Sequence, residues 1–130
     1  MDTQFEFRSK MFPELPGEAD ENINGFIGKA FCEWVRDELP KHGHGTEDQI
    51  IAEDFGWLCY LECEHPLWIG CNHHGEDEDG MSSYTAMVVA EFPKKLFRKG
   101  PDPKPALEAA TRAFRRLIES EPAIVDVQWM

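Results

Sequence analysis

The chain has 130 residues, of which 42% are apolar, and a formal net charge of −12 at pH 7. This apolar content is ordinary for a globular protein, and we expect a single domain spanning residues 1–130. No stretch approaches the ~18 consecutive apolar residues of a membrane span. The first residues, MDTQFEFRSKMF, do not predict a secretory signal. Four cysteines without such a signal indicate reduced thiols, so we expect a cytoplasmic protein that does not bind membranes.

The negative charge is concentrated in the first part of the chain. Residues 1–93 carry 20 acidic and 5 basic side chains, a balance of −15, whereas residues 94–130 carry 8 basic and 5 acidic ones, a balance of +3. Phosphate binding needs clustered Lys and Arg, so we do not expect nucleic acid as a partner. We interpret the basic stretch Lys94, Lys95, Arg98 and Lys99 as a solvated connection between a strand and a helix.

The first third of the chain predicts one strand and one helix. Residues 4–12 alternate apolar with polar side chains, which predicts a strand, and the Pro- and acid-rich residues 13–22 predict a loop. Asn22 or Asn24 is suited to cap a helix that runs to about Leu39. Its buried face has helical spacing and consists of Ile27, Ala30, Phe31, Trp34 and Val35, with Cys32 packing beside it. The polar residues 41–49 predict a connection.

Residues 55–73, FGWLCYLECEHPLWIGCNH, predict the two strands of a β-hairpin. Pro66 cannot donate a ladder hydrogen bond and is expected in the turn. The alternate residues that share one face of the first strand are apolar, but Leu58 and Tyr60 make the other face nearly as apolar. Such strands are typically central, covered by helices on one side and by loops or a partner on the other.

The last third predicts a polar loop at 72–83, a strand at 84–92 and a helix to about Glu121, followed by a strand at 124–129. Asp102 is suited to cap this helix, with Pro103 in its first turn. Its apolar face consists of Leu107, Ala110, Phe114, Leu117 and Ile118. The order β-α-β-β-β-α-β predicts an α+β fold. We expect an antiparallel sheet of about five strands with two amphipathic helices packed on one face.

Known catalytic signatures do not occur in the sequence. It contains no GxGxxG, P-loop, HExxH or GxSxG motif. Asp77, Asp79 and Gly80 fit positions three, five and six of a calcium-binding loop, but Gly75 and Ala86 replace the carboxylates of positions one and twelve. The pairs His42-Gly-His44 and His73-His74 lie in predicted loops, without an Asp or Glu at a motif spacing. The catalytic residues therefore stay unknown.

Two Cys-x-His pairs form the most specific candidate site: Cys63 with His65, and Cys71 with His73. Residues two apart in a strand share a face, and two thiolates with two imidazoles suit tetrahedral zinc. With a loop of residues 66–68, Cys63 would face Cys71 and all four side chains would share one face. With a Pro66-Leu67 loop, Cys63 would face Gly70 and the pairs would lie on opposite faces. In the alternative interpretation the cysteines, Cys59 included, are packing residues and no cofactor is bound.

The sequence supports competing hypotheses for function. The first is a small acidic module that binds a protein partner, for instance a basic one that it inhibits, by analogy with the small acidic immunity proteins that neutralise nuclease toxins. A homodimer is also compatible with the sequence. The second is a metal- or thiol-dependent enzyme, or a zinc-binding protein, that uses the Cys and His cluster. The third is a small-ligand pocket between sheet and helices, lined by Trp34, Trp57 and Trp68.

Overall fold

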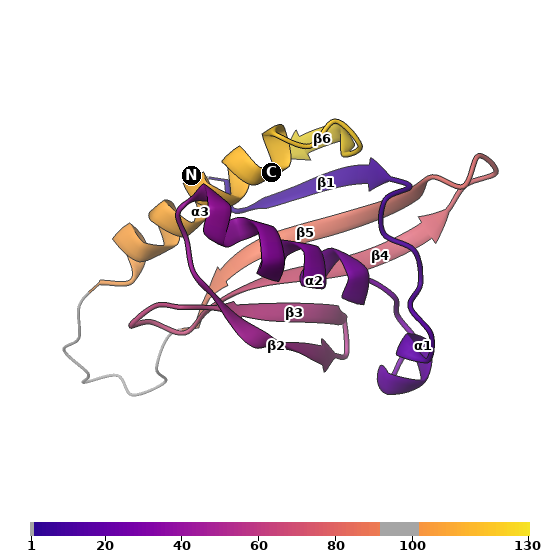
Figure 1. Ribbon diagram of the computed structural model, residues 1–130, viewed down its shortest axis with the longest axis horizontal. Helices are drawn as coiled ribbons and strands as arrows, with labels where there is room; N and C mark the ends of the chain where they lie inside the picture. Colours follow the sequence, from indigo (N-terminus) through magenta and orange to yellow (C-terminus); the bar gives the residue numbers. More distant parts are fainter. Residues whose placement is uncertain (1, 92–101) are drawn as a thin grey trace.

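The computed structural model describes residues 2–91 and 102–130 (Figure 1). In chain order the elements are β1 (Gln4–Ser9), α1 (Glu18–Glu21), α2 (Lys29–Glu38), the 3₁₀ helix η1 (Leu39–His42), β2 (Thr46–Glu53), β3 (Gly56–Leu61), β4 (Leu67–Glu76), β5 (Ser82–Ala90), α3 (Lys104–Glu119) and β6 (Val125–Trp129). Pro93 and the basic stretch Lys94, Lys95, Arg98 and Lys99 lie outside the described residues.

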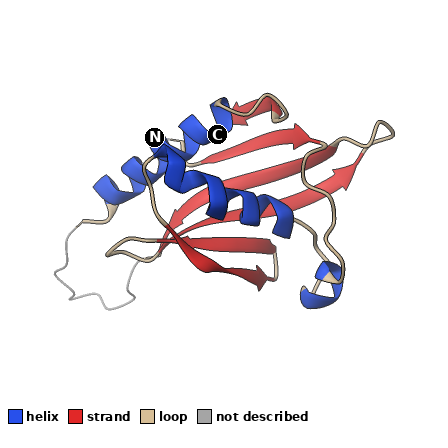
Figure 2. Cartoon of the chain, viewed as in Figure 1, coloured by secondary structure: helices blue, strands red, loops and turns tan. Residues whose placement is uncertain are grey.

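The strands form one antiparallel sheet in the order β2-β3-β4-β5-β1-β6, and α2 and α3 pack on the same face of it (Figure 2). The predicted α+β fold with two helices on one face is therefore confirmed, with six strands instead of about five. The additional strand is β2, whose first residues were expected to be a connection. None of its residues is fully buried, because it is an edge strand held by backbone pairing with β3. Its polar sequence therefore lacks the usual strand pattern.

The central hairpin consists of β3 and β4, which neighbour each other as predicted. Its register pairs Trp57 with Cys71 and Cys59 with Ile69, and residues 62–66 form the turn, with Pro66 in it. Both registers considered from the sequence, Cys63 opposite Cys71 and Cys63 opposite Gly70, are wrong. The strand β3 ends at Leu61, so the polar residues after it belong to a longer turn than either register assumed. The following hairpin also extends into the expected polar loop, since β4 reaches Glu76 and β5 begins at Ser82.

The helices begin later than their capping residues suggested. In α2 the N-cap is Gly28, and neither Asn22 nor Asn24 caps it. In α3 the N-cap is Pro103, while the Asp102 carboxylate still accepts the backbone N–H of Lys104 at 3.0 Å. The predicted buried faces are largely correct: Phe31 and Val35 are buried in α2, and four of the five residues predicted for α3 are buried, namely Ala110, Phe114, Leu117 and Ile118.

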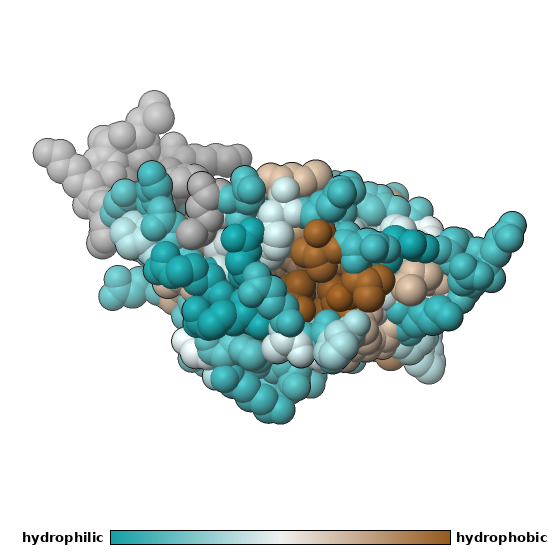
Figure 3. All heavy atoms as spheres, turned by 90° about the horizontal axis from the view of Figure 1, so that it is seen from above, coloured by the Kyte–Doolittle hydropathy of each residue, from teal (hydrophilic) through white to brown (hydrophobic). Residues whose placement is uncertain are grey.

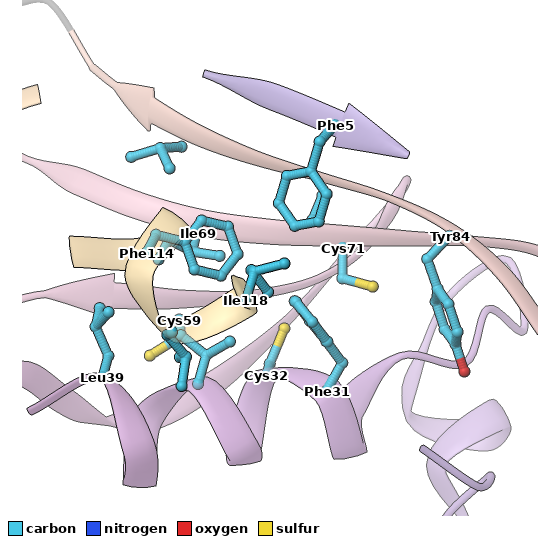
Figure 4. Packing of buried hydrophobic residues seen from close by; sticks show 14 of the residues in the cluster. Phe5, Phe31, Cys32, Leu39, Cys59, Ile69, Cys71, Tyr84, Phe114 and Ile118 are labelled. Atoms are coloured by element: carbon cyan, nitrogen blue, oxygen red, sulfur yellow. The ribbon is translucent and has the colours of Figure 1, made fainter. Parts of the chain in front are cut away.

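The core lies between the two helices and one face of the sheet, which we call the covered face. Aromatic rings dominate it: the centroid of Phe5 lies 5.3 Å from that of Phe114, and the centroid of Phe7 lies 5.1 Å from that of Phe31. Figure 4 shows Phe5, Phe31 and Phe114 pointing toward one another from β1, α2 and α3. Cys32 packs among them with no exposed surface, as expected for a packing residue. Burial of these rings, at about 2–3 kcal/mol each, holds the helices on the sheet.

Candidate functional site

The structure separates the four residues of the predicted zinc cluster. Cys63 and His65 lie in the turn after β3, and Cys63 is exposed. Cys71 is buried on the covered face opposite Trp57, and His73 lies two residues further along β4. Because Cys63 does not pair with Cys71, the two Cys-x-His pairs do not form one site in this hairpin. Among residues 2–91 and 102–130, no group of three or more His, Cys, Asp or Glu side chains is arranged to hold a metal ion.

Three of the four thiols are in the core. Burial raises the pKa of Cys32 and of Cys71 far above the ordinary range, and it raises the pKa of Cys59 to about 11. Only a thiolate acts as a nucleophile or a metal ligand, so these side chains behave as small apolar groups near neutral pH. The structure therefore offers no support for a thiol mechanism that uses Cys32, Cys59 or Cys71.

The paired histidines of β4 bond to hydroxyl groups on opposite sides of the sheet. The Nε2 atom of His73 lies 3.0 Å from the Oγ atom of Ser82, and the ring of His74 contacts the hydroxyl of Thr85. Burial, followed by the charge of His74, lowers the pKa of His73, which favours the neutral ring. The Nδ1 atom of His44 lies 2.9 Å from the carbonyl oxygen of the adjacent Gly45. In the described residues His73 and His74 link β4 to β5, and His44 does not join them in one centre.

The three tryptophans of the predicted pocket do not line a common cavity. Trp57 is buried on the covered face, where its Nε1 atom donates to the carbonyl of Phe26 at 3.0 Å. Trp34 is half-buried on α2 at the edge of the same core, and its ring centroid lies 5.4 Å from that of Phe12. Trp68 follows Leu67 and precedes Ile69, both of which face the core, so its side chain lies on the opposite face of the sheet.

That opposite face carries an apolar area over the central strands. Gly70 lies on the same face of β4 as Trp68, and it pairs with Leu58 on β3 and with Met87 on β5. Trp68 itself pairs with Tyr60, and its ring stacks on Phe55 with the centroids 5.5 Å apart. We call this surface the aromatic face; it consists of Phe55, Leu58, Tyr60, Trp68 and Met87.

Gly70 explains how the aromatic face is shaped. A Cβ atom at this position would lie 2.5 Å from Cζ3 of Trp68 and 3.0 Å from Cε1 of Phe55. Both rings therefore approach the Gly70 backbone so closely that a side chain at this position would force them to shift. Leu58, which pairs with Gly70, is only 3% exposed.

Carboxylates lie near Tyr60 of the aromatic face. The Tyr60 hydroxyl donates to Oε1 of Glu91 at 2.9 Å. This hydrogen bond, followed by burial and by the charges of Glu91, Glu53 and Glu47, raises the pKa of Tyr60. The three glutamates form what we call the acidic rim. Its charge favours cationic groups beside the aromatic rings.

The other half of the same face, over β1, β5 and β6, is polar. A groove of about 560 Å³ there is lined by residues that include Glu6, Arg8, His74 and Gln128. Arg8 is held between Asp77 and Asp126, and Asp126 has a left-handed backbone with φ of 54°. The backbone N–H of Met81, together with that of Asp79 and with Arg8, keeps the pKa of Asp77 below its ordinary value, against the effect of desolvation. The carboxylates of Glu6, Asp77 and Asp126 thus outnumber the Arg8 guanidinium in this groove and beside it.

Comparison with known proteins gives no relative: no family model, curated protein or solved structure matches the chain significantly. In the described residues, no helix is both long and apolar enough to cross a membrane. The function is therefore inferred from the geometry of the site itself.

The sequence contains one indication of the aromatic face, namely the apolar residues Leu58 and Tyr60 on the second face of the predicted strand. It did not connect that signal with Phe55, Trp68 and Met87, because the hairpin register decides which residues share the face. Trp68 was instead grouped with the tryptophans of the core.

Proposed function

We propose that the chain is a small acidic module that binds a basic protein partner through the aromatic face. The observation that carries the proposal is the one-sided placement of the helices, since α2 and α3 both pack on the covered face (Figure 1). The aromatic face lies on the other side of the sheet and has the acidic rim beside it. Aromatic side chains are enriched in the centre of protein interfaces, and a charged border favours a partner of opposite sign.

The charge of the whole chain supports the same partner class. A net charge of −12 speeds encounter with a cationic protein and disfavours nucleic acid. An inhibitor of a basic nuclease, by analogy with the small acidic immunity proteins, would use these features in that way. The four free cysteines fit a cytoplasmic location, which is part of the proposal.

A second copy of the chain is the alternative occupant. Figure 3 shows the molecule from the side of α3 and β6, where apolar side chains gather in one place among hydrophilic ones. A hollow there is lined by residues that include Ile118, Ile124 and Val127. Strong negative charge on both copies opposes such a dimer, so we favour the basic partner.

Site-specific photo-cross-linking in cells of the source organism tests the proposal. A benzophenone amino acid replaces Ile51, which pairs with Leu58 beside the aromatic face, and a control carries it at the exposed Arg112 of α3. We expect an adduct with a protein of isoelectric point above about 9 from position 51 and not from position 112. The purified partner should bind more weakly as salt rises from about 0.05 to about 0.5 M. It should also bind the Trp68→Ala variant about tenfold more weakly.

Three results would overturn the proposal: equal adducts from both positions, an acidic partner, or an adduct with a second copy of the chain. Size-exclusion chromatography with light scattering measures the last possibility independently.

A further inference from the structure

The loop between α1 and α2 displays Ile23, whose side chain is 87% exposed. Among the described residues, the other strongly exposed large apolar side chain is Met130, at 49%. A single exposed apolar residue is ordinary in itself. The loop that carries Ile23, however, is fixed on both sides by buried polar side chains.

Glu18 fixes the loop at its two ends. Its carboxylate is 1% exposed and accepts three backbone N–H groups, from Leu15 at 2.6 Å, from Gly28 at 3.1 Å and from Lys29 at 2.9 Å. The last two belong to the first turn of α2, where a negative charge also complements the helix dipole. The residues before α1 and the start of α2 are thereby held by one side chain.

Asn22 fixes the residues on either side of Ile23. It is 4% exposed, and its amide nitrogen donates to the carbonyls of Glu53 and Gly56, both at 2.8 Å. Its amide oxygen accepts the backbone N–H of Asn24 at 3.0 Å and of Phe26 at 3.3 Å. The amide nitrogen thus docks the loop beside the turn between β2 and β3, and the amide oxygen holds the backbone of the loop itself.

The loop adjoins the aromatic face through that turn. The amide of Asn24 donates to the Asp54 carbonyl at 2.7 Å, and a hollow beside it is lined by Asn24, Phe26, Asp54, Phe55 and Asn72. Phe55 is also the ring that stacks on Trp68. The hollow therefore lies between Asn24, the chain neighbour of Ile23, and Phe55 of the aromatic face.

We propose that Ile23 is an anchor residue for the basic partner of the proposed function, on which this inference rests. A side chain on a fixed backbone loses little conformational freedom when a partner covers it, so its burial contributes nearly fully to affinity. Asp54 lines the hollow, and its carboxylate suits a Lys or Arg of the same partner.

Selection from a display library of random peptides tests the anchor even while the natural partner is unidentified. Wild-type protein is the bait, and we expect the enriched peptides to combine apolar with Lys or Arg residues. Each peptide is then titrated against Ile23→Ser, against Ile23→Val and against the matched control Met130→Ser. We expect Ile23→Ser to raise the Kd about tenfold or more, with little change for the other two variants.

The variants also separate the anchor from the proposed function. Both exposed-site serines should unfold at the same denaturant concentration as the wild type, so a loss of binding would not reflect misfolding. If peptides bind Ile23→Ser as tightly as the wild type but bind Trp68→Ala weakly, the anchor is overturned and the aromatic face stands. Equal weakening by Ile23→Ser and Met130→Ser also overturns the anchor. If no peptide is enriched, or if neither Ile23→Ser nor Trp68→Ala weakens binding, the anchor and the docking surface both fail.

Discussion

The two faces of the sheet come from the same strands but differ in what covers them. On the covered face, Phe5, Ile69 and Cys71 have no exposed surface beneath α2 and α3. On the opposite face, Tyr60 and Trp68 are half-buried, and carboxylates stand beside them. Alternation along a strand therefore distributes apolar residues to both sides, and the helix layer decides which side becomes the core.

The largest expected effect is the difference in stability between truncations on the two faces. Phe114→Ala should lower the free energy of unfolding by about 3–5 kcal/mol, because it leaves a cavity among rings that have no exposed surface. Trp68→Ala should cost about 1 kcal/mol, since its ring is half-buried on a surface that can relax. Within the described residues the Trp68 Nε1 atom has no hydrogen-bond partner, so no such bond is lost.

Urea unfolding followed by circular dichroism measures both changes. Similar losses of stability for the two variants would show that the aromatic face belongs to the core, and the proposed docking surface would then be wrong.

A second, smaller effect extends the comparison to carboxylates of α1. Glu18→Ala should lower the free energy of unfolding by about 2–3 kcal/mol, because three backbone N–H groups lose their buried acceptor. Glu21→Ala is the matched control, since Glu21 is exposed and forms a surface ion pair with Lys29 at 2.9 Å. That surface pair should contribute at most about 0.5 kcal/mol. Equal effects in urea unfolding would contradict the role of Glu18 in fixing the loop.

The sequence predicted the fold well where side-chain burial decides it. The helix faces around Phe31 and Phe114 and the pairing of β3 with β4 follow from apolar spacing, and the structure confirms them. It missed β2, because an edge strand without buried residues has no pattern to detect. It also offered Asn22 or Asn24 as a helix cap, whereas the amide nitrogen of Asn22 donates to the carbonyls of Glu53 and Gly56, which are distant in sequence.

The candidate site was harder to predict because it depends on register. The Cys and His cluster needed Cys63 opposite Cys71, and the observed turn of residues 62–66 displaces Cys63 from the strand. Register is set by turn geometry, which composition alone did not specify here. The aromatic face has the same dependence, since only the observed pairing places Tyr60 beside Trp68.

The smallest expected effect is a change in the pKa of one of the two tyrosines, Tyr60 and Tyr84, which lie on opposite faces of the sheet. Burial raises the pKa of Tyr84 on the covered face to about 12, whereas the hydrogen bond to Glu91 is the main cause of the raised pKa of Tyr60. Glu91→Gln should therefore lower the pKa of Tyr60 toward its ordinary value and leave that of Tyr84 unchanged. Salt should have a similar selective effect, because the acidic rim is open to solvent. Carbon-13 NMR of labelled tyrosine rings reports both titrations.

The raised pKa of Tyr84 also predicts how the free energy of unfolding changes with pH. Tyr84 is protonated in the folded chain at pH values where an unfolded chain ionises, so its burial stabilises the fold fully below pH 10. That contribution is lost as the pH rises from 10 toward about 12. Tyr84→Phe removes the ionisable group, and its free energy of unfolding should fall less steeply over this range than that of the wild type. The expected contrast between a buried Tyr84 and a solvent-accessible Tyr60 would be wrong in either of two cases. One is that wild type and Tyr84→Phe lose stability equally steeply with pH, and the other is that Glu91→Gln changes the pKa of both tyrosines.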